Sequence, residues 1–212
     1  MDENIVKTGT TTIGILCKEG IILAADKRAT AGYLIVDKHV DKIYKITDNI
    51  AVTIAGSVSD VQLLVKLIKA EITIKKMRTE KEPTVKETAN LLARMVYANI
   101  RRFSLIPGIS HFIIGGKDKT GFHLYDIFPD GSVTECKDFL STGSGSVMAY
   151  GVLETLYEKD LTLDECVKLA IKSVNAAIQR DIGSGQGIDV VAITNAGIKK
   201  VLTKELDTKI KA

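Results

Sequence analysis

Tryptophan is absent from this sequence, and aromatic residues make up only 5% of its 212 residues. Such a chain offers few of the aromatic side chains on which nucleic-acid bases stack. The net charge of +3 is small, and basic and acidic residues are mixed along the chain, so no basic surface for nucleic acid is expected. Both features argue against a nucleic-acid partner.

Cysteine and histidine are also scarce, with three of each. Cys17, Cys136 and Cys166 lie far apart and form no Cys-x-x-Cys pair, which argues against a disulfide framework or a zinc site and fits a reducing cytosol. His111 and His123 could meet on neighbouring strands, but a zinc site needs three or four converging ligands. We therefore expect neither a metal nor a cofactor.

Long hydrophobic runs are missing too. No apolar stretch approaches the ~20 residues of a membrane-spanning helix, and the first nine residues, MDENIVKTG, lack the apolar stretch of a secretory signal. Hydrophobic residues still make up 45% of the chain, which suffices for a buried core in one domain. We expect a single-domain, cytoplasmic protein with no membrane partner.

What the chain does contain is a regular order of strands and helices. Hairpins are predicted around turns at residues 18–20, 47–49, 129–131 and 195–197. The sequence predicts helices near 61–72, 84–100, 147–157 and 163–179, and capping boxes start two of them. Because hairpins make antiparallel sheets, we expect an α+β fold, a four-layer αββα sandwich of two antiparallel sheets.

The glycine-rich segments fail the usual catalytic tests. STGSGSV contains no serine with glycine both two residues before and two after, so it is no nucleophile elbow. The chain has no GxxxxGK[ST] phosphate loop, and GSGQG lacks the preceding strand of a dinucleotide-binding fingerprint. On composition alone, these glycine clusters are turns.

The segment TGTTT at residues 8–12 admits two interpretations. Threonine favours strands, so the run could simply start the first strand. Alternatively, the bond between Gly9 and Thr10 is cut, and Thr10 becomes an N-terminal residue whose hydroxyl is a nucleophile and whose α-amine is its base. Asp26 and Lys42 could assist, because a lysine ammonium lowers nearby proton affinities and a carboxylate orients that lysine. These residues alone leave both interpretations open.

Six segments, in the order and spacing of one family, favour the second interpretation. They are KTGTTTIGI, AADKRAT, DKIYKI, TIAGSVSD, STGSGSVMAYGVLE and QRDIGSGQGID. Together they resemble the catalytic β-type subunits of the 20S proteasome, of the archaeal kind, over essentially the whole chain. The resemblance implies the αββα fold of N-terminal-nucleophile hydrolases. It also implies that residues 1–9 are a propeptide removed by autocatalysis from a catalytic domain of residues 10–212.

The resemblance implies a role for each residue of a threonine protease site. Thr10 would be the nucleophile, Lys42 its activating cation and Asp26 the partner of that cation. The backbone N–H of Gly56 would stabilise the oxyanion. Ser144 would form a hydrogen bond near the amine of the threonine, and Asp181 with Ser184 would support it from the other side.

Substrate binding and assembly follow from the same resemblance. Thr30 and Gly56 would bind an extended peptide by backbone hydrogen bonds. Ala29, Ile54 and Val58 would form an apolar pocket with a hydrophobic, chymotrypsin-like preference. The implied partners are other β subunits in a seven-membered ring, a second β ring, α-subunit rings and a regulatory ATPase that feeds unfolded protein.

Three alternatives remain open at this point. The chain could be a structural β-type subunit without activity, an N-terminal-nucleophile amidase acting on a small molecule, or one of the simpler bacterial peptidases related to the proteasome. The presence of Gly9, Thr10 and Lys42 argues against the first. The match outside the threonine region argues against the second, and the long segments GSVSDVQLLVKLIKAE and STGSGSVMAYG argue against the third.

Overall fold

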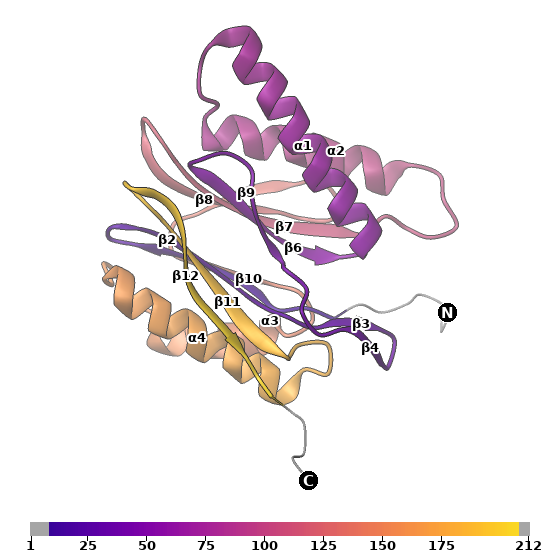
Figure 1. Cartoon of the computed structure of the whole chain (residues 1–212), viewed down its shortest axis with the longest axis vertical. Coiled ribbons are helices and arrows are strands. Elements are labelled where there is room, and N and C mark those ends of the chain that lie inside the picture. The colour runs from indigo at the N-terminus through magenta and orange to yellow at the C-terminus, as the bar shows by residue number, and fades with distance from the viewer. Residues whose placement is uncertain (1–8, 208–212) are drawn as a thin grey trace.

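Four layers build the molecule in the computed structural model, which describes residues 9–207 (Figure 1). Two sheets pack face to face, and each carries a pair of helices on its outer side. The predicted αββα sandwich is therefore confirmed. The first helix pair is α1 (Val58–Thr79) and α2 (Val85–Arg101), and the second is α3 (Ser146–Leu156) and α4 (Leu163–Arg180). Among the described residues, no helix combines the length and apolar character needed to cross a membrane.

The sheet beneath α3 and α4 has the strand order β10-β1-β2-β11-β12, and every neighbouring pair is antiparallel. Its central strand β2 is buried along its whole length, as expected for a strand that is covered on both faces. The strands of this sheet are β1 (Thr12–Cys17), β2 (Gly20–Asp26), β10 (Phe139–Thr142), β11 (Gly187–Thr194) and β12 (Gly197–Glu205).

The sheet beneath α1 and α2 runs in simple chain order, β5-β6-β7-β8-β9, and is also antiparallel. Its strands are β5 (Ile43–Lys45), β6 (Ile50–Gly56), β7 (Ser110–Asp118), β8 (Gly121–Ile127) and β9 (Val133–Cys136). A separate hairpin of β3 (Ala29–Ala31) and β4 (Leu34–Asp37) projects beside the sandwich (Figure 1). Strands β3, β4 and β10 were not predicted from the sequence, and each has only three or four residues.

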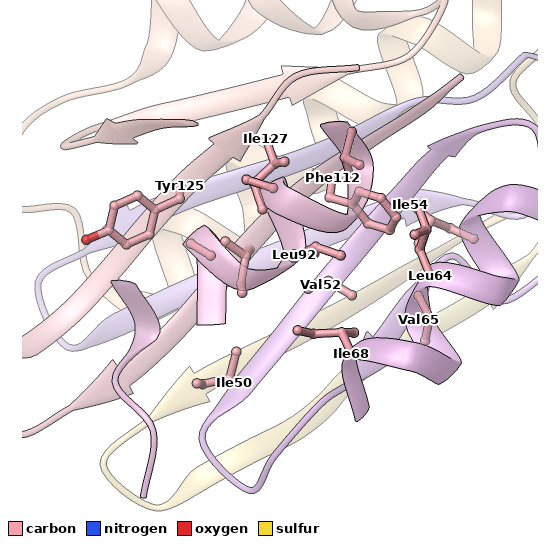
Figure 2. Close-up of a cluster of buried hydrophobic side chains, with 14 of the residues drawn as sticks. Ile50, Val52, Ile54, Leu64, Val65, Ile68, Leu92, Phe112, Tyr125 and Ile127 are labelled. Carbon is pink, nitrogen blue, oxygen red and sulfur yellow. The ribbon is translucent and has the colours of Figure 1, made fainter. Parts of the chain in front are cut away.

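The buried apolar residues form three clusters, one in each space between the layers. Figure 2 shows the cluster beneath α1 and α2, where Val52 of β6 lies opposite Ile68 of α1. Between the sheets the approach is close, because a Cβ atom on Gly14 would lie 2.8 Å from Leu124 and 2.9 Å from Ile113. Glycine at this position in β1 therefore lets the two sheets meet.

Both predicted capping boxes are present. Thr84 accepts a hydrogen bond from the backbone N–H of Glu87, and the Glu87 side chain accepts one from the Thr84 N–H. Thr162 and Glu165 repeat the arrangement at the start of α4. The boxes satisfy backbone donors that a helix start leaves without partners, which explains why these two boundaries were predicted well.

Candidate active site

Thr10 lies just before β1 and is only 8% exposed. Its hydroxyl donates a hydrogen bond of 2.6 Å to the carbonyl oxygen of Gly9, the residue before it. The Gly9 N–H donates to Thr30 Oγ1 at 2.9 Å, which fixes the backbone on the other side of that carbonyl. A Cβ atom on Gly9 would lie 2.1 Å from the Cα atom of Gly183. Only glycine fits at position 9 in this arrangement.

Asp26 ends β2 and is completely buried, yet its carboxylate is fully hydrogen-bonded. Oδ1 accepts from the Thr11 N–H at 2.9 Å and from Lys42 Nζ at 2.6 Å. Oδ2 accepts from the N–H groups of Arg28 at 3.0 Å and Gly185 at 2.9 Å. Four donors, one of them cationic, therefore fix the position of this buried carboxylate.

Lys42 comes immediately before β5 and is 3% exposed. Its backbone carbonyl accepts a hydrogen bond from the Ile54 N–H at 3.0 Å, so β6 holds the lysine in place. Burial lowers the pKa of Lys42 below its ordinary value, and the attraction of Asp26 opposes this effect only in part. A buried lysine with a lowered pKa can accept a proton as well as carry charge. Lys42 and Thr10 line the same pocket.

A second polar group lies on the other side of Thr10. The Thr10 N–H donates to Ser144 Oγ at 3.2 Å, and Ser144 Oγ donates to Asp181 Oδ2 at 2.7 Å. Ser184 donates to the same carboxylate oxygen at 2.6 Å. Because the Ser184 proton is used there, the hydroxyl of Thr11 donates to Ser184 Oγ, also at 2.6 Å. Ser144, Asp181 and Ser184 therefore lie together on one side of Thr10, and Asp181, directly after α4, links the two serines.

Gly56 ends β6 with a φ of +115°, a backbone conformation that favours glycine. A Cβ atom there would lie 2.3 Å from the carbonyl oxygen of Ile109. Gly56 lines the same pocket as Thr10 and Lys42. The geometry therefore requires glycine at the position that the resemblance assigns to the oxyanion donor.

A pocket beside Thr10 contains about 410 Å³ of space, which includes open solvent. Ala29, Ile54 and Val58 all line it, as predicted, and so does Thr30. Ile54 also belongs to the buried cluster of Figure 2, so the core of the domain supports one wall. Six further residues line the pocket and were not predicted from the sequence to do so: Arg28, Val40, Tyr44, Ala55, Val61 and Gln62.

Arg28, one of these six residues, also connects two parts of the site. Its guanidinium donates to Gln186 Oε1 at 2.7 Å and to the Ile182 carbonyl at 2.8 Å. Arg28 therefore ties the loop after α4, which carries Asp181, to the end of β2, which carries Asp26. The only available signal was its position two residues after Asp26 in AADKRAT.

The histidines do not meet. His111 contacts Asp126 at 2.7 Å, while His123 contacts Glu135 at 2.9 Å and Asp118 at 3.5 Å. Within residues 9–207, no three or more histidine, cysteine or acidic side chains gather in a way that could hold a metal ion.

Comparisons with known proteins agree with this geometry. A family model described as "Proteasome subunit" matches residues 6–193. The "Proteasome subunit beta" of Ferroglobus placidus is 48% identical over 207 residues, which cover 98% of this chain and 97% of the relative. Those of Methanocaldococcus vulcanius and Archaeoglobus profundus are 45% identical over 199 residues and 44% over 205, covering 93% and 97% of this chain and 87% and 94% of the relatives. The similarity spans both helix pairs and both sheets.

Proposed function

The chain belongs to the proteasome subunit family as a β-type core subunit, which implies a protease, and from that premise we propose that it is a threonine-type endopeptidase. Its nucleophile is the hydroxyl of Thr10. One observation carries the proposal: Thr10, Lys42 and Gly56 line one pocket, and a buried Asp26 holds Lys42. The arrangement offers a nucleophile, a proton acceptor and an oxyanion donor around one peptide carbonyl.

Maturation comes first in this proposal. The Thr10 Oγ attacks the carbonyl carbon of Gly9, the acyl group moves from nitrogen to oxygen, and water hydrolyses the ester. The 2.6 Å contact between this hydroxyl and the Gly9 carbonyl oxygen supports the step. In the uncut chain the Thr10 nitrogen is an amide and cannot act as a base. Lys42, with its lowered pKa, is then the proton acceptor. Residues 1–8 of the proposed propeptide lie outside the described residues.

Cleavage would free the α-amine of Thr10, with a pKa of about 7.7–8.0 in its unperturbed state. Ser144, already 3.2 Å from this nitrogen, would hold the amine, and Asp181 would hold Ser144. The amine, directly or through a water, and Lys42 then share the proton of the hydroxyl. A freed amine close to neutrality is a suitable base for a cytoplasmic enzyme, and a cytoplasmic location remains part of the proposal.

Peptide hydrolysis follows the same chemistry. The Thr10 Oγ attacks the scissile carbonyl, and the Gly56 N–H stabilises the oxyanion, an interaction worth about 3–4 kcal/mol in comparable sites. The leaving amine takes a proton, and water then hydrolyses the acyl-enzyme. The extended substrate lies along Thr30 and Gly56 and pairs with their backbone groups.

The pocket residues Ala29, Ile54 and Val58 give this activity a hydrophobic preference, because they offer no charge to pair with a basic or acidic side chain. Fluorogenic peptides that end in leucine or tyrosine should therefore be cleaved faster than those that end in arginine or glutamate. The reverse ranking would refute the pocket assignment while leaving the nucleophile untested by that experiment.

Assembly with other subunits is supported by α1, whose outer face is apolar as well as its inner face. Four exposed apolar residues of α1 recur at helical spacing, on the side of the helix opposite the buried Leu64 and Ile68. A continuous apolar stripe on a helix surface fits packing against another protein. We infer a seven-membered β ring, a second β ring, α-subunit rings and a feeding ATPase as the partners. The stripe consists of Leu63, Leu67, Ile74 and Met77.

The proposal is tested by co-assembly with α subunits, in wild type and in Thr10→Ala. The expected result is loss of residues 1–9 and peptide hydrolysis in the wild type only. A wild type that keeps its N-terminus and hydrolyses nothing would favour a purely structural subunit. Hydrolysis of small amides but not of peptides would favour an amidase.

A further inference from the structure

Two of the three cysteines, which the proposed activity does not use, lie in one buried cluster. Cys17 ends β1, where Ile13, Ile15 and Cys17 alternate toward the helices α3 and α4. Cys166 lies in α4, is fully buried and belongs to the same cluster. Both thiols are free. Residues distant in sequence thus bring two oxidisable groups to one place.

Hydrogen bonds hold the turn after β1, which follows Cys17, against the start of α4, which carries Cys166. The Lys18 N–H, directly after Cys17, donates to the Leu161 carbonyl at 3.1 Å. The Leu163 N–H, at the start of α4, donates to Glu19 Oε2 at 2.9 Å. Cys166 follows within the first turn of α4, in the same buried cluster as Cys17, and its thiol is near enough to affect the pKa of Cys17. The turn between β1 and β2 is therefore held against the start of α4, with the two thiols in one buried cluster.

We propose that Cys17 and Cys166 form a reversible disulfide in the folded protein when a low-molecular-weight disulfide is present. One thiol loses its proton, and the thiolate attacks a sulfur of the small disulfide and releases one small thiol. The second thiolate then attacks the protein sulfur of this mixed disulfide and releases the other small thiol. Two electrons pass from the cysteines to the oxidant, and two protons end on the released thiols.

The reaction will be slow at neutral pH. The neighbouring Cys166 thiol and burial hold the pKa of Cys17 well above its usual range, so little thiolate is present. Cys17 is 8% exposed and Cys166 is 0% exposed, so only a small oxidant reaches the pair as the structure opens locally. The rate should therefore rise with pH and with temperature.

The consequence concerns stability rather than hydrolysis. The bond would join β1 to α4 at the ends that lie away from the candidate site, because β1 starts beside Thr10 and α4 ends beside Asp181. Along the six residues of β1, the separation is about 20 Å. A disulfide between Cys17 and Cys166 would close most of the chain into one long loop, which restricts the unfolded chain strongly. Activity of the oxidised protein should stay within about twofold of that of the reduced protein, since neither sulfur touches the site.

The test uses the full chain in its assembled particle, incubated with cystamine, then alkylated without reduction and analysed by mass spectrometry. The expected result is a linked peptide pair containing Cys17 and Cys166, a rise in Tm of roughly 5–15 °C, and reversal of both by dithiothreitol. Cys136→Ala is the matched control, because Cys136 lies outside the cluster, and it should behave like the wild type. Cys17→Ala and Cys166→Ala should each abolish the rise in Tm.

Two results would overturn the proposal. The first is full alkylation of Cys17 and Cys166 in the wild type after prolonged oxidation at raised temperature and pH. The second is a stable mixed disulfide on either residue in place of the linked pair. Neither readout requires that the alanine variants fold.

Discussion

Two polar arms meet at Thr10, and they differ in burial and in charge. The charged arm is Asp26 with Lys42, which are 0% and 3% exposed. The hydroxyl arm is Ser144, Asp181 and Ser184, in which the serine nearest to Thr10 is exposed. An ion pair in a buried setting controls proton affinity, whereas a hydroxyl group near solvent, such as that of Ser144, mainly fixes orientation. On the proposed mechanism, the charged arm performs the proton transfer and the hydroxyl arm positions the amine.

The largest effect is expected from removing the hydroxyl of Thr10, the group that both arms contact or orient. Thr10→Ala should lower kcat/KM for peptides by at least about 10⁴-fold, as in other hydrolases that lose their nucleophile, and the Gly9–Thr10 bond should stay intact. Peptide hydrolysis and intact mass measure the two outcomes. Thr10→Ser is the matched control, because it keeps the hydroxyl, and it should retain both processing and activity. A fully active Thr10→Ala variant would contradict the account.

The next largest effect is expected from Lys42→Arg, which distinguishes the positive charge of Lys42 from its role in proton transfer. Arginine keeps a positive charge near Asp26 but does not release its proton. Lys42→Arg should therefore slow removal of residues 1–9 by about 10²–10⁴-fold, the usual contribution of a general base. The conversion of precursor to mature chain is followed by mass spectrometry. Wild-type rates in this variant would show that Lys42 supplies charge alone.

A pH profile sharpens the same point. Lys42 must be neutral to accept a proton, and burial lowers its pKa below the ordinary 10.5. Protonated lysine predominates at low pH, so the processing rate should rise as the pH rises through this lowered pKa and then level off. The rate is measured on freshly assembled precursor. A rate that falls over this range would contradict the assignment.

A substitution in the hydroxyl arm should lower kcat by a smaller factor. Ser144→Ala removes one hydrogen bond to the Thr10 nitrogen, so kcat should fall about 5–50-fold, as expected for one bond to a charged amine. KM should stay nearly unchanged, because Ser144 does not line the pocket. Steady-state kinetics with a leucine-ending peptide measure both constants. A loss as large as that of Lys42→Arg would remove the difference between the two arms.

The smallest effect on activity is expected from a second buried ion pair, which serves as a control for the charged arm. Lys27 contacts Asp189 at 3.1 Å, and both residues are buried. The pair does not line the pocket beside Thr10. Asp189→Asn should lower the free energy of unfolding at pH 7 by about 1–3 kcal/mol, as measured by denaturant unfolding, with the pH profile of processing unchanged. A shifted profile would show that proton transfer is not confined to Lys42.

Acid stability tests the same pair. Burial alone would raise the pKa of Asp189, but hydrogen bonds from Thr203, Lys27 and Lys200 together lower it below the ordinary 3.8. The ionised carboxylate therefore adds stability above pH 3.8, and this stability is lost as the pH falls through the lowered value. Acid unfolding of the wild type should show this loss, and Asp189→Asn should not.

Patterns with a local physical cause were readable from the sequence. The capping boxes at Thr84 and Thr162 place two helix starts, and the continuous apolar character of β2 and β6 predicts strands covered on both faces. The candidate site could not be predicted from such local patterns. The residues alone left the role of Thr10 open, and the family resemblance brought Asp26 and Lys42 to it.

The features that were missed depend on tertiary contacts. Strand β10 is four residues long and is stabilised by pairing with β1, more than 120 residues earlier in the chain. Tyr44 and Gln62 reach the pocket from different elements, and neither carries a local signal of this. Lys27 is a charged residue that becomes buried because Asp189, far along the chain, pairs with it. Such partners are visible only once the chain has folded.

N-terminal sequencing of active, assembled particles tests the central claim most directly. If an N-terminal threonine supplies both nucleophile and amine, the sequence of every active subunit begins Thr10-Thr11-Thr12. Particles with full peptidase activity whose chains begin at Met1 would contradict the account.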